Sequence, residues 1–203
     1  MGKLAKFLLI LDIFVVLILF GGLLADKQML SNNVLRLHVV ANSDSADDQK
    51  IKLQVRDAVL SVLEPALASV TDKKYAECYI ENHLREITDA ANSALKAAGT
   101  DDRATVTLCR EEFPVREYET FSLPSGLYDS LRITIGNGEG KNWWCVVFPS
   151  LCISAASKDT SDVAVSAGFS DTLTGAITGD KEYEFSFFFL DCLGRLENFF
   201  HVG

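Results

Sequence analysis

Cys145, His38 and Asp44 are the residue types from which a cysteine-dependent hydrolase is built, and an enzyme acting on the cell envelope is one interpretation of this chain. A cysteine nucleophile needs a base within hydrogen-bond reach and a positive environment that lowers its pKa. Cys145 instead follows two tryptophans inside an apolar run, and an apolar environment raises the pKa of a thiol. The pattern therefore disfavours a catalytic role for Cys145.

Cys145 and Cys152 are close in sequence, and Pro149 between them permits a chain reversal. A disulfide between them would persist outside the cytoplasm, whereas two buried free thiols would behave as small apolar side chains. The sequence leaves both a Cys145–Cys152 disulfide and a pair of free thiols open.

Two segments have the composition of ligand-binding loops but not the spacing. Residues 42–48 (NSDSADD) lack the glycine and the final glutamate of an EF-hand, and helix capping explains the same acids. Residues 136–141 (GNGEGK) lack the Gly-Lys-Ser/Thr ending of a phosphate loop and fall between predicted strands. The histidines are dispersed and the cysteines form no C-x-x-C pair. We therefore predict no metal site, no cofactor and no small-molecule substrate.

The stretch 131–152 (LRITIGNGEGKNWWCVVFPSLC) contains most of these residues. Residues 131–135 alternate between apolar and polar side chains, as in a half-buried strand, and the glycines after them indicate a turn or loop. Residues 143–148 read as a second strand that is apolar on both faces. Successive side chains of a strand point to opposite faces, so Trp143 and Trp144 should lie on opposite sides of the sheet. We predict that the two strands form a hairpin.

The chain before this stretch predicts a strand and a helix. Residues 34–41 alternate as a strand with one face that tolerates polar side chains. Ser45, followed by Asp48 three residues later, is typical of a helix N-cap. Pro65 should kink the helix or end it near Leu63, because proline removes one hydrogen bond and clashes with the preceding turn.

A second helix is expected from Asp72 to Ala98, with Asp72 as its N-cap and Gly99 just beyond its C-terminal end. The fold class that follows is α+β, with two helices packed on a mainly antiparallel sheet. The remaining predicted segments are strands at 104–110, 113–119 and 182–190, a flexible insertion at about 154–181, and a short amphipathic helix at 193–202.

The N-terminus predicts export. Lys3 and Lys6 precede an apolar run from Phe7 to Leu24, which favours a hydrophobic signal or anchor helix with its N-terminus inside the cell. We assign residues 1–30 to a signal peptide or membrane anchor, and leave open which of the two it is. Residues 31–203 form a single extracytoplasmic α+β domain in this interpretation.

The charge of the chain argues against a nucleic-acid partner. The formal net charge is −9, from 28 acidic and 19 basic residues. The basic residues cluster only in the N-terminal hexapeptide, whereas nucleic-acid binding requires a basic patch or stripe.

Two segments together resemble the stage II sporulation protein R family. The first is RLHVVANSDS (36–45), continued by Asp48-Gln49 and by the pattern Lys52-x-x-Val55-Arg56-Asp57-Ala58-Val59. The second is the stretch 131–152, in which Ser150 stands where the family commonly has a second proline. The resemblance implies a signalling protein rather than an enzyme. It would be exported from the forespore into the space between the septal membranes, where it activates a membrane-embedded aspartic protease that processes the precursor of the early mother-cell sigma factor.

If this resemblance holds, the tryptophan-rich stretch is a candidate contact for that protease. Aromatic residues and arginine dominate the energetics of protein interfaces, so Trp143, Trp144, Arg36 and Arg132 are the candidate partner-binding residues. The alternatives are the cysteine-dependent hydrolase and a structural protein of the cell envelope.

Overall fold

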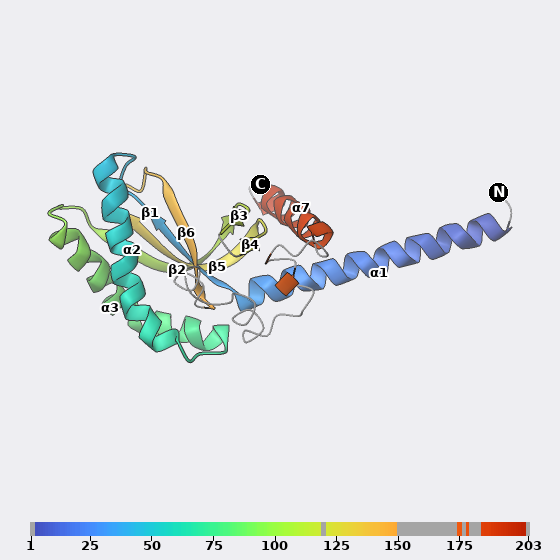
Figure 1. Ribbon diagram of the computed structural model, residues 1–203, viewed down its shortest axis with the longest axis horizontal. Coiled ribbons are helices and arrows are strands. Elements are labelled where there is room, and N and C mark those ends of the chain that lie inside the picture. Colours follow the sequence, from blue (N-terminus) through green and yellow to red (C-terminus); the bar gives the residue numbers. More distant parts are fainter. Residues whose placement is uncertain (1–2, 119–120, 150–173, 176–177, 179–183, 202–203) are drawn as a thin grey trace.

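A four-stranded mixed sheet forms the centre of the protein (Figure 1). The computed structural model describes residues 3–118, 121–149, 174–175, 178 and 184–201. The predicted α+β class is confirmed. The sheet has one parallel pairing at its centre, between β1 and β5. Its other two pairings, β1 with β6 and β2 with β5, are antiparallel. The strand order is β2 (Ala104–Phe113), β5 (Gly126–Ile135), β1 (Leu35–Val40) and β6 (Asn142–Phe148).

The predicted hairpin of β5 and β6 is wrong, because β1 lies between these two strands. The glycine-rich loop 136–141 therefore crosses the end of β1 instead of turning back beside β5. Its backbone is bound to the segment after β1: the Gly140 N–H donates to the Ala41 carbonyl oxygen at 2.9 Å, and the Glu139 N–H to that of Asn42 at 3.1 Å. Side-chain alternation indicates which residues share a face, but it carries no information on strand order.

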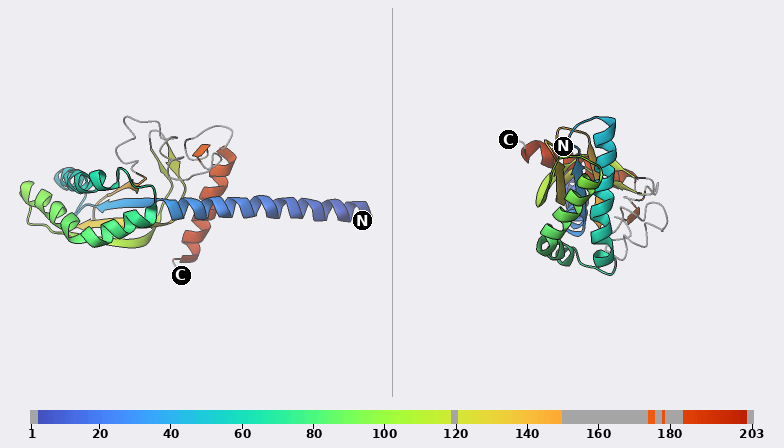
Figure 2. Two further views of the ribbon diagram at one scale, coloured as in Figure 1. Left: turned by 90° about the horizontal axis from the view of Figure 1, so that it is seen from below. Right: turned by 90° about the vertical axis from the view of Figure 1, so that its left-hand side faces the viewer.

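Helices α2 (Ala46–Leu67) and α3 (Lys73–Ala97) cover one face of the sheet, as Figures 1 and 2 show. The predicted N-caps are confirmed: the Ser45 hydroxyl accepts from the Asp48 N–H at 3.1 Å, and the Asp72 carboxylate accepts from the Lys74 N–H at 2.8 Å. The predicted Gly99 position is also confirmed, with a φ of 78° immediately after the C-cap of α3. Each cap fixes the residue at which its helix begins or ends.

Pro65 is predicted to kink α2 or to end it near Leu63. The second alternative is wrong, because the helix continues to Leu67, and the kink stays a prediction. Leu63 and Leu67 are both buried, so the turn that contains Pro65 carries an apolar side chain into the core. Burying a leucine side chain contributes about 1.5–3 kcal/mol, which is similar to the cost of about 3 kcal/mol for a proline inside a helix.

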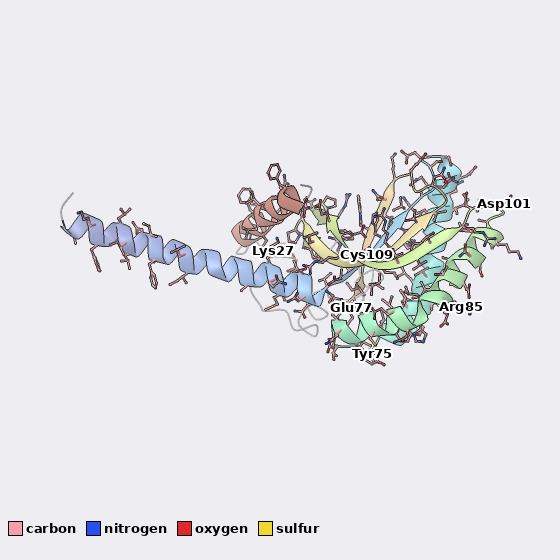
Figure 3. All side chains as sticks on the ribbon, turned by 180° about the vertical axis from the view of Figure 1, so that it is seen from behind. Lys27, Tyr75, Glu77, Arg85, Asp101 and Cys109 are labelled. Carbon is pink, nitrogen blue, oxygen red and sulfur yellow. The ribbon has the colours of Figure 1, made fainter. Side chains whose placement is uncertain are left out.

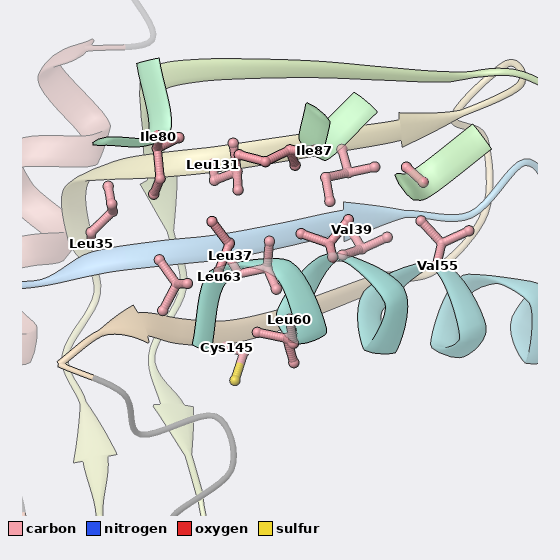
Figure 4. Packing of buried hydrophobic residues seen from close by; sticks show 14 of the residues in the cluster. Leu35, Leu37, Val39, Val55, Leu60, Leu63, Ile80, Ile87, Leu131 and Cys145 are labelled. Atoms are coloured by element: carbon pink, nitrogen blue, oxygen red, sulfur yellow. The ribbon is translucent and has the colours of Figure 1, made fainter. Parts of the chain in front are cut away.

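The main core lies between these helices and the sheet (Figure 4). β1 contributes Leu35, Leu37 and Val39 to it, while Arg36 and His38 of the same strand point to the opposite face. All six residues of β1 are buried, as expected for a strand at the centre of a sheet with both faces covered.

The opposite face of the sheet is covered at one end by a second core. This second core consists of residues from the end of α1 (Lys3–Asn33) and just after it, from the sheet, from α7 (Glu184–His201), and from β4 (Ser122–Leu123) and just before it. Strand β4 pairs with β3 (Arg116–Glu117) in a small second sheet. The buried members of the second core are Leu30, Val34, Phe113, Phe121, Leu123, Tyr128, Val146 and Leu190.

The predicted strand at 182–190 is wrong, because residues 184–190 belong to helix α7; residues 182–183 lie outside the described residues. Leu190, Asp191 and Gly194 lie on one side of the helix and pack against the chain around Ser125. The Ser125 hydroxyl donates to the Asp191 carboxylate at 2.7 Å, and a Cβ at Gly194 would meet the Ser125 carbonyl oxygen at 1.5 Å. The predicted helix at 193–202 is confirmed as far as residue 201, as the C-terminal part of α7.

Helix α1 projects from the domain (Figures 1 and 2) and is crossed by α7 near its inner end. The Lys27 ammonium donates to the Leu193 carbonyl oxygen of α7 at 3.5 Å, and Figure 3 shows Lys27 beside that helix. Among the described residues, no helix combines the length and the apolarity needed to cross a bilayer. Most of the predicted insertion at 154–181 lies outside the described residues.

Candidate functional site

The two tryptophans of the chain lie on opposite faces of the sheet, as their adjacent positions on β6 predict. Trp143 pairs with Val39 and Trp144 with His38. Trp143 packs against the main core, and the guanidinium of Arg56 from α2 lies 4.4 Å from its ring centroid. Trp144 packs against the second core on the other side. A partner bound to one face of the sheet therefore meets only one of the two rings.

The polar face of the sheet, by which we mean the face opposite α2 and α3, holds the other predicted contact residues. Arg36 and Arg132 both point to it, together with Trp144. Arg36 is 0% exposed, whereas the side chain of Arg132 is 43% exposed. The structure thus brings together Arg36, Arg132 and Trp144, and separates Trp143 from them.

A hydrogen-bonded network around His38 occupies the middle of the polar face. The Nδ1 of His38 lies 3.0 Å from a Glu111 oxygen, and its Nε2 lies 2.9 Å from the Asn142 side-chain oxygen. The His38 ring stacks on that of Trp144, with ring centroids 5.5 Å apart. Arg132 contacts the same Glu111 oxygen at 3.3 Å. Glu111 therefore links the buried histidine to the partly exposed arginine.

The pKa of Glu111 is lowered from its ordinary value. Burial alone would raise this pKa, but the interactions with His38 and Ser130 and the positive charge of Arg132 favour the ionised carboxylate and together outweigh burial. The carboxylate is thus held as an acceptor for both neighbours.

A group of two arginines and four aromatic rings lies next to this network, at the covered end of the polar face. The Arg36 guanidinium lies 3.9 Å from the Phe113 ring centroid and 5.0 Å from that of Tyr128, and its Nη2 donates to the Tyr118 hydroxyl at 3.0 Å. Arg116 of β3 lies 3.7 Å from the centroid of Trp144. We call Arg36, Arg116 and these four rings the arginine–aromatic cluster.

Sequence reasoning missed Glu111, Asn142, Arg116 and Tyr118. The alternation of β2 continues to Phe113, beyond the predicted end at residue 110, and would have placed Glu111 on the same face as Cys109. No local pattern marks Arg116 and Tyr118, because the small sheet of β3 and β4 brings them to the polar face through tertiary contacts.

Cys145 and His38 cannot form the nucleophile and base of a hydrolase in this fold. Cys145 is buried in the main core, opposite Leu37 (Figure 4). His38 points instead to the polar face. Cys145 is also disulfide-bonded, so its sulfur is not a thiolate. Cys152 lies outside the described residues, and its pairing with Cys145 stays a prediction.

The segment 42–48, which we weighed as a calcium loop, instead caps α2 and holds the crossing loop. Ser45 caps the helix, the Asn42 side-chain oxygen accepts from the Asn137 N–H at 2.9 Å, and an Asp44 oxygen accepts from the Lys141 N–H at 2.7 Å. Within the part of the chain that the structure describes, no three potential metal ligands cluster. Asp44 and Asp48 of this segment thus have structural partners.

These contacts join the two sequence motifs into one unit. The motif 36–45 supplies β1 and the α2 cap, and the stretch 131–152 supplies the strands on both sides of β1 and the loop that crosses its end. A change in one motif must therefore be accommodated by the other.

Comparison with known proteins identifies relatives for this unit. The family model described as Stage II sporulation protein R matches residues 31–158. Stage II sporulation protein R from Bacillus subtilis (strain 168) is 34% identical over 155 residues, which cover 70% of this chain and 69% of that protein. No solved structure matches.

Proposed function

The chain belongs to the stage II sporulation protein R family, and from this membership we propose that it is an exported sporulation signal that activates a membrane-embedded aspartic protease. The protease would then process the precursor of the early mother-cell sigma factor. In this role the chain acts by binding, and its own residues carry out no bond cleavage.

The observation that carries the proposal is the joining of the two motifs on β5, β1 and β6. Their side chains serve packing, capping and loop attachment, and they place an aromatic and cationic surface on the polar face. The same strands put Cys145 and His38 on opposite faces, which removes the pair that motivated a hydrolase. The arrangement supports recognition of a partner better than catalysis.

Arg132 and Trp144 are the first candidates for contact with the protease. Arg132 is partly exposed and Trp144 is half-buried, both on the polar face, and Thr105 and Thr107 of β2 are exposed near them. Arg36 is fully buried and would support this surface from beneath. Trp143 would have a packing role on the other side of the sheet.

The N-terminal helix is proposed to direct the chain out of the forespore. Lys3 and Lys6 precede its apolar segment, and large apolar side chains along it, including Phe7, Ile10 and Phe14, are 60–65% exposed. Such a surface favours contact with the export machinery or with lipid. N-terminal sequencing of the chain recovered from sporangia would show whether this segment is cleaved.

Complementation in an endospore-forming bacterium that lacks its own family member tests the role. Expression of the chain in the forespore should restore the processed form of the sigma factor, detected by immunoblot. Arg132→Ala should reduce processing without loss of chain abundance. Arg56→Ala is the matched control, because Arg56 also lies near a tryptophan and pairs with a carboxylate, but on α2, and it should leave processing unchanged. Equal processing with and without the chain would exclude the proposed role.

A further inference from the structure

Two arginines of the arginine–aromatic cluster lack the carboxylate that a buried guanidinium normally requires. Arg36 is 0% exposed and Arg116 is half-buried. Within the described residues, no Asp or Glu side chain forms an ion pair with either guanidinium. A buried charge without a counter-ion is costly, so such a group usually has a specific partner.

Several N–H donors of these arginines are buried and have no acceptor. They are Nε and Nη1 of Arg36 and Nε of Arg116. The bond from Arg36 Nη2 to the Tyr118 hydroxyl satisfies one nitrogen only. The faces of the guanidinium groups are covered by aromatic rings, but rings do not replace in-plane hydrogen-bond acceptors. The unmet requirement is therefore for oxygen atoms at the edges of the two groups.

The two positive charges lie close to each other. Arg36 donates to the Tyr118 hydroxyl, which in turn donates to the Trp144 carbonyl oxygen at 3.4 Å, and Arg116 lies over the ring of that tryptophan. Burial lowers the pKa of Arg116, and the charge of Arg36 lowers it further, against the opposing effect of Tyr118. An anion placed between the two arginines would relieve both effects.

We propose that Arg36 and Arg116 form a binding site for a carboxylate group. A carboxylate supplies two acceptor oxygens and is planar, which suits guanidinium groups stacked on the rings of Phe113 and Trp144 better than a tetrahedral phosphate does. Arg116, Tyr118 and Trp144 are each half-buried, so the ligand would approach from their side, while Arg36 is 0% exposed and lies beneath them. The site does not depend on the proposed role in sporulation, because its evidence is confined to these contacts.

Binding can be followed at the site itself, because the chain has two tryptophans and Trp144 is the one beside Arg116. In a Trp143→Phe background, the purified full chain in detergent is titrated with sodium acetate at constant ionic strength, with sodium chloride as the reference salt. Fluorescence of Trp144 and the NMR signals of the arginine Nε–H groups should change saturably with acetate. The absence of any change beyond that seen with chloride would overturn the proposal, since water would then satisfy the donors.

Variants assign the binding to the two arginines. Arg116→Gln should weaken acetate binding by about tenfold or more, as expected for the loss of a charge-assisted hydrogen bond. Arg56→Gln is the matched control, because it removes the arginine beside the other tryptophan, Trp143. Since Trp143 must be present for this comparison, acetate binding by Arg56→Gln is measured in the wild-type background, from the NMR signals of the arginine Nε–H groups alone. Equal weakening by both variants would overturn the site. Arg36→Lys, checked for native circular dichroism, should also weaken binding because lysine lacks the guanidinium fork.

Two further ligands define the chemistry and the source of the carboxylate. Sodium phosphate should bind more weakly than acetate, and equal or tighter binding of phosphate would overturn the preference for a carboxylate. N-acetyl-aspartate amide carries the same group on a peptide unit. Tighter binding of this compound than of acetate would support a carboxylate on a protein chain, and weaker saturable binding would support a small free carboxylate.

Discussion

His38 and Glu111 show how polar side chains are accommodated beneath the surface of this sheet. Each ring nitrogen of His38 has an oxygen partner, and one Glu111 oxygen contacts both His38 and Arg132. Buried polar groups that are paired in this way stabilise a unique arrangement, whereas loss of one partner leaves the others unsatisfied. The polar face therefore depends on individual residues more than the apolar core does.

Glu111→Gln should make the protein less stable and less sensitive to acid. Because the pKa of Glu111 is lowered in the folded state, the unfolded chain takes up the proton first as the pH falls below the ordinary glutamate pKa of 4.5. The carboxylate thus contributes its full stabilisation above that pH and loses it as the pH falls through the folded-state pKa. The free energy of unfolding in urea should drop by about 1–3 kcal/mol at pH 7 in the variant, with a smaller further loss in acid.

Glu112→Gln is the control for this measurement, because Glu112 is exposed at the next position of β2. Its effect at pH 7 should stay within about 0.5 kcal/mol. An acid dependence of Glu111→Gln equal to that of the wild type would show that Glu111 is not the group responsible.

Cys145→Ser should lower stability only under oxidising conditions. Cys145 is disulfide-bonded, and closing a loop of the length that Cys152 would give contributes about 2–3 kcal/mol. Cys152→Ser should have the same effect if these two residues are partners. In dithiothreitol the wild type and both variants should unfold at nearly the same urea concentration, and a persistent difference there would point to packing of Cys145 instead.

At the scale of the elements, the crossing loop 136–141 connects the two motifs. A Cβ at Gly140 would lie 2.2 Å from the Ser43 carbonyl oxygen and 2.9 Å from the Ala41 Cβ, whereas a Cβ at Gly99 would meet nothing within 4 Å. The glycine at 140 is needed for close approach, and the glycine at 99 for its positive φ. These two requirements can be separated by substitution.

Gly140→Ala should destabilise the protein more than Gly99→Ala does. The clash at residue 140 is with backbone, so the loop must move, at a cost of about 2–3 kcal/mol. At residue 99 the cost is the left-handed backbone alone, about 1 kcal/mol. Urea unfolding measures both. A smaller effect at Gly140 would contradict the close packing of the loop on the segment after β1.

The parts of the fold that sequence predicted are those determined by neighbouring residues. Ser45, Asp72 and Gly99 act through contacts within a few positions of themselves, and the opposite faces of Trp143 and Trp144 follow from strand geometry. The strand order and the arginine–aromatic cluster depend on contacts between distant segments, which periodicity does not encode. The prediction of a strand at residues 184–190 is wrong because a dense run of phenylalanines fits both the two-residue period of a strand and the 3.6-residue period of a helix. The tertiary contacts of Leu190, Asp191 and Gly194 with the rest of the domain favour the helix.

At the scale of the whole molecule, the chain combines a helix-covered sheet with a polar face and a projecting N-terminal helix (Figure 1). The main core lies between α2, α3 and the sheet, and the polar face carries the partly exposed Arg132 and the half-buried Trp144. The surface proposed for recognition is therefore separate from the main core. It fits a protein whose role is to be recognised.

Reconstituted processing tests the proposed role most directly. Vesicles that contain the membrane-embedded protease and the sigma-factor precursor are mixed with the purified chain on their extracytoplasmic side, and cleavage of the precursor is followed by gel electrophoresis. We expect cleavage only when the chain is present, reduced cleavage with Arg132→Ala, and unchanged cleavage with Arg56→Ala. Cleavage at the same rate without the chain would contradict the proposal that this protein activates the protease.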